Sequence, residues 1–200
     1  MSTDDQVRWN GKYTQNPQSW ETADDFLEPA YVMVMEDSVP GRALDIAGGA
    51  GRHSVWLAQR GWQVTMLDIS DAGVDLARKK AQAAGVEIDA RVADLSGGPM
   101  EAPFGVPDLG GSYGLIVVFF FLHRTLFPAI LQALKPGGHL IYKTYTIDQL
   151  QFDQGPRDAE FLLQHGELLE AFRDTQVLQY REVVTAGEKA VVEMVARKNL

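Results

Sequence analysis

Residues 44–52 read Leu44-Asp45-Ile46-Ala47-Gly48-Gly49-Ala50-Gly51-Arg52, a glycine-rich loop between an apolar run and an amphipathic run. The apolar run predicts a strand, and the amphipathic run predicts a helix. Glycines let a backbone turn tightly and approach a ligand closely because no Cβ intervenes. The helix that follows offers free backbone N–H groups at its N-terminus. The loop is therefore predicted to be a ligand site at the end of a strand.

The remainder of the chain continues this alternation. From Gly41 onward the patterns predict strands over 43–46, 63–67, 86–92, 115–121, 139–146, 176–184 and 190–197. They predict helices over 52–60, 71–84, 126–134 and 167–172, the second one capped by Asp71. Such alternation forms a mostly parallel sheet with helices on both faces, and the turn Ala186-Gly187-Glu188 adds an antiparallel C-terminal hairpin. The expected fold class is α/β, with a Rossmann-like, mostly parallel seven-stranded sheet.

Length and composition predict a single domain. The chain has 200 residues, of which 46% are apolar, enough for one sizeable core and too few for two. We expect one domain over residues 1–200, with an N-terminal helical cap over 1–40 and a Rossmann-like core over 41–200. The cap either covers a ligand or only packs on the core; it contains Trp9, Tyr13, Trp20 and a helical run at 24–36.

The charge balance is acidic. With 18 basic and 27 acidic side chains, the formal net charge is −9. Binding to phosphates requires a basic surface, so this balance argues against nucleic acid or an anionic membrane as the main partner. We expect a small-molecule partner instead, and a chain that is either a monomer or a homodimer.

The chain has no cysteine. This excludes thiolate nucleophiles, cysteine zinc sites, iron–sulfur clusters and disulfides, and it fits a reducing compartment. The start of the chain, Met1-Ser2-Thr3-Asp4-Asp5, lacks the pattern of a signal peptide. The longest apolar run, 115–122, is too short for a membrane helix and predicts a buried strand. We therefore expect a cytoplasmic protein.

The glycine loop does not complete a dinucleotide pattern. That pattern requires Gly-x-Gly-x-x-Gly, yet the third glycine counted from Gly49 falls on Ser54, and the second counted from Gly48 falls on Ala50. Asp45, directly before the loop, suits a ligand with a positive charge and no phosphate. A nicotinamide oxidoreductase is therefore the less favoured alternative.

Two further strand ends carry carboxylates. Asp68 ends the second predicted strand, where a carboxylate accepts hydrogen bonds from ribose hydroxyls. Asp94 follows the third strand and either meets an adenine edge or begins the turn at Gly97-Gly98-Pro99. Ile69 or Leu95 would lie against the ring face. Together these residues predict a nucleoside ligand.

Residues 42–70 resemble the cofactor region of class I S-adenosylmethionine-dependent methyltransferases. More narrowly, the chain resembles the bacterial tellurite-resistance-type small-molecule methyltransferases. The motifs that carry this resemblance are Arg8-Trp9-Asn10, Gly51-Arg52-His53, Phe121-Leu122-His123-Arg124 and Leu134-Lys135-Pro136-Gly137-Gly138. One departure is Ala47, which stands where the class usually has glycine.

The resemblance implies S-adenosylmethionine as the cofactor, S-adenosylhomocysteine as the product, and no metal. Glycines of the loop would line the methionine part, Asp45 would hold the amino end, and Asp68 the ribose. The full cofactor-binding set that it implies is Asp45, Ala47, Gly48, Gly49, Gly51, Asp68, Ile69, Ala93, Asp94, Leu95 and Phe119.

The catalytic residue is less defined, with His123 and Tyr13 as candidates. His123 would orient a substrate or act as a base, or it would only begin a helix. Trp9 and Tyr13, one helical turn apart, would form an aromatic lid over the sulfonium. Residues 146–164 predict either a substrate lid or a disordered connection, and 97–114 a plain surface connection.

The function expected is direct in-line methyl transfer from S-adenosylmethionine to a small molecule. The alternative is a non-catalytic regulatory or carrier protein that binds the same cofactor. Methyltransferases that act on DNA amino groups carry an Asn/Asp-Pro-Pro-Tyr/Phe stretch where this chain has Phe119-Phe120-Phe121-Leu122. This difference argues against a nucleic-acid acceptor, whereas a protein acceptor stays open.

Overall fold

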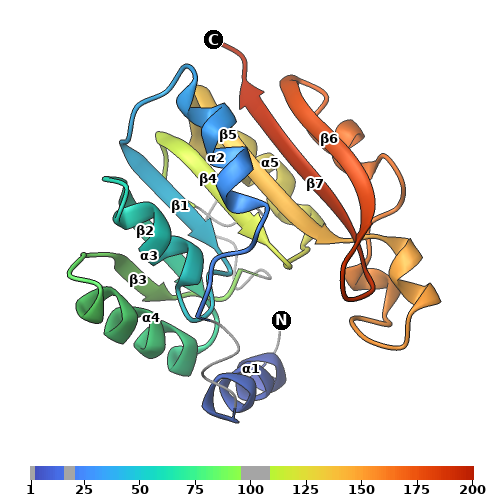
Figure 1. Ribbon diagram of the computed structural model, residues 1–200, viewed down its shortest axis with the longest axis horizontal. Coiled ribbons are helices and arrows are strands. Elements are labelled where there is room, and N and C mark those ends of the chain that lie inside the picture. The colour runs from blue at the N-terminus through green and yellow to red at the C-terminus, as the bar shows by residue number, and fades with distance from the viewer. Residues whose placement is uncertain (1–2, 16–20, 96–108) are drawn as a thin grey trace.

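The computed structural model describes residues 3–15, 21–95 and 109–200. Its centre is a seven-stranded sheet with the order β3-β2-β1-β4-β5-β7-β6 (Figure 1). The strands are β1 (Arg42–Ile46), β2 (Gln63–Asp68), β3 (Asp89–Val92), β4 (Tyr113–Phe119), β5 (Leu134–Tyr145), β6 (Thr175–Thr185) and β7 (Lys189–Lys198). The first five strands pair in parallel, and β7 lies antiparallel between β5 and β6. The expected Rossmann-like sheet with its C-terminal hairpin is confirmed.

Helices cover both faces of this sheet, as expected. They are α1 (Thr3–Gln15), α2 (Leu27–Met35), α3 (Arg52–Ala58), α4 (Asp71–Ala83), α5 (Phe127–Ala133) and α6 (Glu167–Ala171), with 3-10 turns η2 (Arg124–Leu126), η3 (Ile147–Gln151) and η4 (Ala159–Phe161). Side chains alternate across β1, so Leu44 and Ile46 pack with α5 and α6, whereas Ala43 packs with α2 and α3. Figure 1 shows α2 and α3 in front of the sheet and α5 behind it.

Several element boundaries differ from the sequence prediction. The third strand begins at Asp89, not at residue 86, and the fifth begins at Leu134, before the Lys135-Pro136-Gly137-Gly138 turn. The fourth strand ends at Phe119, two residues early, because Phe120 has a φ of 56° and leaves the extended region. These turns depend on tertiary contacts and carry no periodicity of their own.

Helix termini differ as well. Ser70, and not Asp71, caps α4, since its side chain accepts a hydrogen bond from the Gly73 N–H at 3.0 Å. The first turn of the helix predicted at 24–36 is replaced by a turn in which the Asp24 carboxylate accepts from the Phe26 N–H. The helix predicted at 126–134 is split into η2 and α5.

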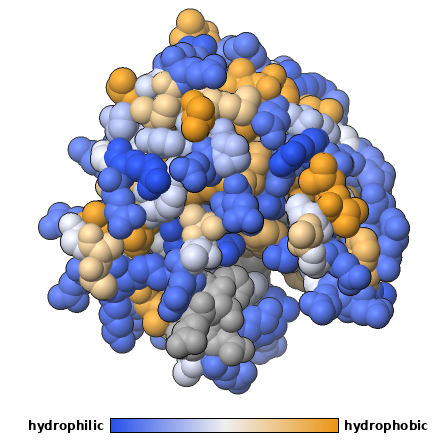
Figure 2. Space-filling view, viewed as in Figure 1, coloured by the Kyte–Doolittle hydropathy of each residue, from blue (hydrophilic) through white to orange (hydrophobic). Residues whose placement is uncertain are grey.

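Apolar residues on the surface are scattered. Val7, Val32, Val39 and Val184 are exposed, and Figure 2 shows small separate apolar groups on a mostly hydrophilic face. In the described part of the chain, no helix combines the length and the apolar character needed to cross a membrane. Trp20 and most of the predicted surface connection, 97–108, lie outside the described residues.

Candidate functional site

A cavity of about 820 Å³ lies at the carboxyl ends of the central strands. Parallel α/β sheets place ligands at this edge. Of the predicted site residues, those that line the cavity are Tyr13, Ala47, Gly48, Gly49, Asp68, Ile69, Ala93, Leu95 and Phe119. Four others, Asp45, Gly51, Asp94 and His123, are not part of the lining. The structure thus brings together most of the predicted cofactor set.

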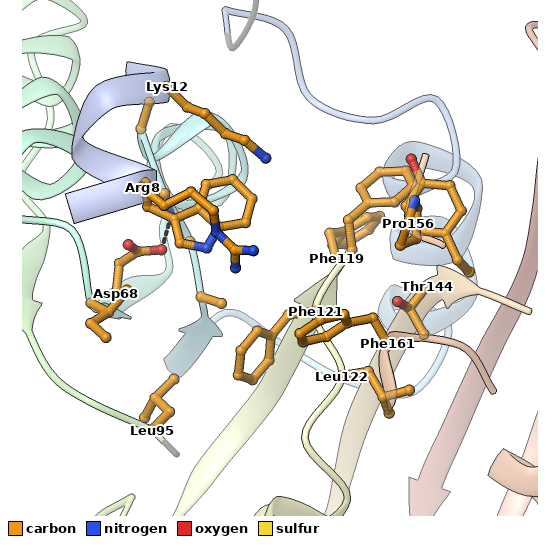
Figure 3. Close-up of a pocket in the computed structure, with 18 of the residues that line it drawn as sticks. Arg8, Lys12, Asp68, Leu95, Phe119, Phe121, Leu122, Thr144, Pro156 and Phe161 are labelled. Atoms are coloured by element: carbon orange, nitrogen blue, oxygen red, sulfur yellow. Dashed lines mark hydrogen bonds between the residues drawn. The ribbon is translucent and has the colours of Figure 1, made fainter. Parts of the chain in front are cut away.

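The cavity has two ends. We call the side formed by Ala47–Ala50, Asp68, Ile69, Ala93 and Leu95 the glycine-loop end. The opposite side, formed by Arg52, Phe119–Leu122, Thr144, Tyr145, Gly155–Asp158, Phe161 and Lys189, is the Phe120 end. Figure 3 shows Arg8 and Lys12 on the same side as Asp68, with Thr144, Pro156 and Phe161 across the cavity.

The glycine loop has left-handed backbone at two lining positions. Gly49 has a φ of +57°, and a Cβ built on it would lie 2.1 Å from the Tyr13 hydroxyl oxygen. Ala47 has a φ of 55°, a conformation that costs an L-residue about 1–2 kcal/mol. A glycine would adopt this conformation without that cost. The alanine at position 47, where the class usually has glycine, is therefore accommodated with some backbone strain.

Gly51 serves helix packing. It precedes α3 with a φ of +75°, and a Cβ there would meet the Ala77 Cβ at 2.5 Å. The missing side chain therefore lets α3 and α4 approach each other behind the loop.

Asp68 lies at the end of β2 and is only 5% exposed. Its two carboxylate oxygens accept hydrogen bonds of 2.8 Å from the backbone N–H groups of Gly49 and Ser70. Burial raises the pKa of Asp68, while these two hydrogen bonds lower it. Each oxygen keeps a second lone pair for a ligand hydroxyl. Asp68 therefore fixes the glycine loop and faces the cavity at the same time.

Asp45 lies behind the loop and is 1% exposed. The Ser54 hydroxyl donates to it at 2.6 Å, and a Cβ on Gly48 would lie 2.8 Å from its Oδ2. Burial raises the pKa of Asp45 to about 7. In the described structure Asp45 supports the loop and the first turn of α3.

Helix α1 is fixed above the glycine-loop end by Asn10. The Asn10 amide donates to Asp71 at 2.6 Å and accepts from the Ser70 hydroxyl at 2.6 Å. Ser70 itself caps α4 and follows Asp68, which lines the cavity, after one residue. The sequence pointed to Arg8-Trp9-Asn10 as a motif but not to this role, because the partners are about sixty residues away.

The aromatic residues of α1 face the cavity. The rings of Trp9 and Tyr13 are stacked, with centroids 5.9 Å apart, and both line the cavity. Burial, followed by the charge of Asp68, raises the pKa of Tyr13 well above its ordinary range. The Tyr13 phenol therefore stays protonated at neutral pH and can donate a hydrogen bond, but it is a poor candidate for a base. A lid role for this pair stays a prediction.

His53 lines the cavity, and the sequence analysis had given it no role. Its ring stacks on Phe119 at 4.1 Å, and its Nε2 accepts from the Asp24 N–H at 3.2 Å. Burial lowers the pKa of His53 well below its ordinary value. The imidazole is thus neutral, with its acceptor nitrogen already engaged, and it positions Phe119.

His123 directly precedes η2, at its N-cap position, and does not line the cavity. Its Nε2 is buried and has no hydrogen-bond partner among the described residues. The next residue, Arg124, pairs with Glu167 and donates to the carbonyls of Glu160 and Leu162. Arg124 therefore anchors the segment that precedes α6.

Residues 146–164 are folded and are not a disordered connection. They form η3 and η4, and Gln149 ties them to the hairpin by accepting from the Ala190 N–H at 2.8 Å. Five residues of this segment line the cavity: Gly155, Pro156, Arg157, Asp158 and Phe161. The position fits a lid, and movement of the segment stays a prediction.

Comparison with known families agrees with this geometry. Residues 43–138 match the family model described as "Methyltransferase domain". This match covers a little under half of the chain and shows what that part of the chain is similar to. The matched residues begin in β1 and end in β5, so they include the glycine loop and Asp68.

Curated proteins that this chain resembles include two from bacteria. A ubiquinone biosynthesis O-methyltransferase of Marinobacter nauticus is 30% identical over 127 residues, 61% of this chain and 51% of the relative. The probable S-adenosyl-L-methionine-dependent methyltransferase TehB of Haemophilus influenzae is 25% identical over 151 residues, 72% of this chain and 49% of the relative. The chain thus spans about half the length of these relatives.

Solved structures show the same fold. Magnesium protoporphyrin IX methyltransferase from Synechocystis, solved with bound S-adenosylhomocysteine, matches with a TM-score of 0.74 and 15% identity, covering 98% of this chain and 99% of that chain. TehB from Haemophilus influenzae matches with a TM-score of 0.68 and 18% identity, covering 86% and 62%. The chain therefore has the Rossmann-like fold of class I methyltransferases.

Proposed function

We propose that this chain is an S-adenosylmethionine-dependent methyltransferase that transfers a methyl group directly, in line, to a small molecule. One observation carries the proposal: Asp68 and the left-handed Gly49 are hydrogen-bonded to each other and face one cavity at the carboxyl ends of β1 and β2. A carboxylate at this position suits ribose hydroxyls, and a backbone without Cβ suits close approach of a ligand.

The residues at the glycine-loop end fit this cofactor. Asp68 would accept from the ribose hydroxyls, while Ile69, Ala93 and Leu95 offer apolar surface to an adenine ring. Asp45 and Gly51 would act from behind, by shaping the loop, and the exposed Asp94 would border the adenine side.

The basic residues of α1 extend this fit. Arg8 and Lys12 line the cavity on the Asp68 side, where either would attract the carboxylate of the methionine part. The two cations lie near each other, with the Lys12 Nζ 4.2 Å and the Arg8 Cζ 5.9 Å from the centre of the Trp9 ring. Burial, and then repulsion by the charge of Arg8, lowers the pKa of Lys12. A carboxylate between them would relieve that repulsion.

When bound, S-adenosylmethionine supplies a methyl group on a positively charged sulfur. The chain's part is to align the reactants and to exclude water, because charge is dispersed as the methyl group leaves such a centre. Phe119, Phe121 and Leu122 give the cavity an apolar wall at the Phe120 end. Tyr13 and His53, the described lining groups most suited to proton transfer, are respectively protonated and engaged. The chain therefore suits an acceptor that is already electron-rich.

Calorimetry with S-adenosylmethionine and S-adenosylhomocysteine tests the proposal. We expect both to bind, and we expect Asp68→Asn to weaken binding about 10- to 100-fold, the loss of one charge-assisted hydrogen bond or more. Asp75→Asn is the matched control, because Asp75 is an exposed carboxylate on α4 whose ion pair, within the described part of the chain, is with Arg78. Failure of both compounds to bind the wild-type protein would contradict the proposal.

A further inference from the structure

The lining of the cavity has the opposite charge from the chain as a whole. The chain carries a formal charge of −9. The cavity is nevertheless lined by five basic side chains, Arg8, Lys12, Arg52, Arg157 and Lys189, against two carboxylates, Asp68 and Asp158. A concave site with an excess of one sign focuses the field and attracts a ligand of the other sign.

Two of these cations meet at one ring. The Lys189 Nζ lies 5.4 Å from the centre of the Phe120 ring, and the Arg52 Cζ lies 5.9 Å from it. Lys189 begins β7 and Arg52 begins α3, so the two charges come from opposite parts of the chain. This arrangement brings two positive charges to the Phe120 end, away from Arg8 and Lys12.

A third cation at this ring is already neutralised. The Lys143 Nζ lies 5.7 Å from the Phe120 ring but pairs with Asp24 at 2.7 Å and with Glu193 at 3.0 Å. Glu193 also pairs with Arg181. Asp24 and Glu193, the carboxylates near this end, are thus paired with the buried Lys143 and with Arg181 of the hairpin. Lys189, in contrast, takes part in none of the ion pairs within the described ranges, and its Nζ lies at the Phe120 ring. Arg52 donates to the Thr22 carbonyl at 3.4 Å and is near the charges of Asp24 and Asp45.

The backbone that carries this ring has an unusual conformation. Phe120 has a φ of 56°, which is unusual for an aromatic residue, and its N–H donates to the Lys143 carbonyl at 2.7 Å. The Phe120 ring lies 5.3 Å from the Tyr145 ring at an angle of 46°. The half-buried Phe120 therefore packs against the core and also offers an aromatic surface to the cavity, near Arg52 and Lys189.

We propose that the methyl acceptor is a small organic anion, with its carboxylate between Arg52 and Lys189 and its apolar body against Phe120 and Tyr145. This inference rests on the proposed function, because it assigns the Phe120 end to the acceptor of the same reaction. An organic acid satisfies both features of this end, the charge and the aromatic surface, whereas an inorganic oxyanion would use only the charge.

The test compares 4-mercaptobenzoate with its methyl ester, which carries the same thiol and ring without the anionic carboxylate. Binding is measured by calorimetry on protein saturated with S-adenosylhomocysteine, and turnover is measured with labelled S-adenosylmethionine. We expect the acid to bind about tenfold more tightly than the ester and to have the lower KM. We expect Lys189→Gln to remove most of this preference, with about a tenfold loss for the acid and less than about twofold for the ester.

Lys79→Gln is the matched control, since Lys79 is an exposed lysine on α4 that does not line the cavity. It removes the same charge from the chain and should leave the preference unchanged. Equal binding of acid and ester by the wild-type protein would overturn the inference. An equal loss of affinity for the acid and for the ester in Lys189→Gln would overturn it as well. A protein that methylates selenite but neither organic probe would also overturn it.

The two proposals fail separately. Protein that binds S-adenosylhomocysteine but does not distinguish acid from ester contradicts only the acceptor assignment. Protein that does not bind S-adenosylhomocysteine contradicts the proposed function. In that case the same acid and ester comparison on the unliganded protein still decides whether the Phe120 end selects an organic anion.

Discussion

The glycine-loop end takes its residues from three consecutive strand ends within residues 47–95, whereas the Phe120 end takes its residues from positions between Arg52 and Lys189. At the first end, much of the surface is backbone, and hydrogen bonds such as that from the Gly49 N–H to the Asp68 carboxylate fix its position. At the second end the surface consists of side chains carried by a strand end, a hairpin and the 146–164 segment. This contrast suggests a fixed end for a shared cofactor and a changeable end for the acceptor.

Substitution of Gly49 should cause the largest loss of cofactor affinity, because it changes only the glycine-loop end. In Gly49→Ala the new Cβ would lie 2.1 Å from the Tyr13 hydroxyl, at a φ of +57°, so both Tyr13 and the loop must move. We expect S-adenosylhomocysteine to bind about 100-fold more weakly in calorimetry. Gly111→Ala is the control, because a Cβ there meets nothing within 4 Å. Wild-type affinity in Gly49→Ala would show that the loop is more adaptable than its contacts indicate.

Loss of the α1 anchor should have a smaller effect. Asn10→Ala removes the hydrogen bonds to Asp71 and Ser70 that hold α1 above the glycine-loop end. We expect about a tenfold loss of S-adenosylhomocysteine affinity and faster proteolysis of α1. Thr14→Ala serves as the control, since the Thr14 hydroxyl donates only to the Asn10 carbonyl of its own helix. Unchanged affinity with faster proteolysis would mean that α1 is not part of the cofactor site.

Asp45 should affect stability more than affinity. Burial raises the pKa of Asp45 from 3.8 to about 7, so the unfolded chain releases this proton at a lower pH than the folded protein does. The stability associated with the protonated carboxyl is complete below the unfolded pKa and is lost as the pH rises through about 7. Asp45→Asn has no such proton and keeps an acceptor for Ser54.

Urea unfolding of the two unliganded proteins measures this difference. Near pH 3.8, the pKa of Asp45 in the unfolded chain, we expect the free energy of unfolding of Asp45→Asn to match that of the wild type. Above pH 7, where Asp45 is ionised in the folded wild type as well, we expect Asp45→Asn to be more stable by up to about 4 kcal/mol. We also expect its affinity for S-adenosylhomocysteine to change less than about threefold. A stability difference that does not depend on pH would rule out the raised pKa, and a large loss of affinity would assign Asp45 to direct contact with the ligand.

Much of the fold followed from local pattern. The alternation of apolar and amphipathic runs predicted the seven strands and the C-terminal hairpin, because short apolar runs such as the fully buried β4 are typical of strands between helices. The boundaries that were wrong have different causes. At Ser70 a local hydrogen bond from the Gly73 N–H selects the capping residue. Asp89 and Leu134 begin their strands where they pair with Thr65 and Tyr113, and Phe120 leaves the strand through its positive φ, none of which periodicity encodes.

The sequence by itself determined the glycine-loop end. Gly48, Gly49 and Asp68 lie at consecutive strand ends, and parallel strands necessarily bring such ends to one edge of the sheet. Only the tertiary structure decided that Arg52, Phe120 and Lys189 meet, and that Asn10 fixes α1 to the loop after Asp68. These residues are 60 or more positions from the partners they meet, so their approach depends on how whole elements pack, and no local pattern in the chain specifies it.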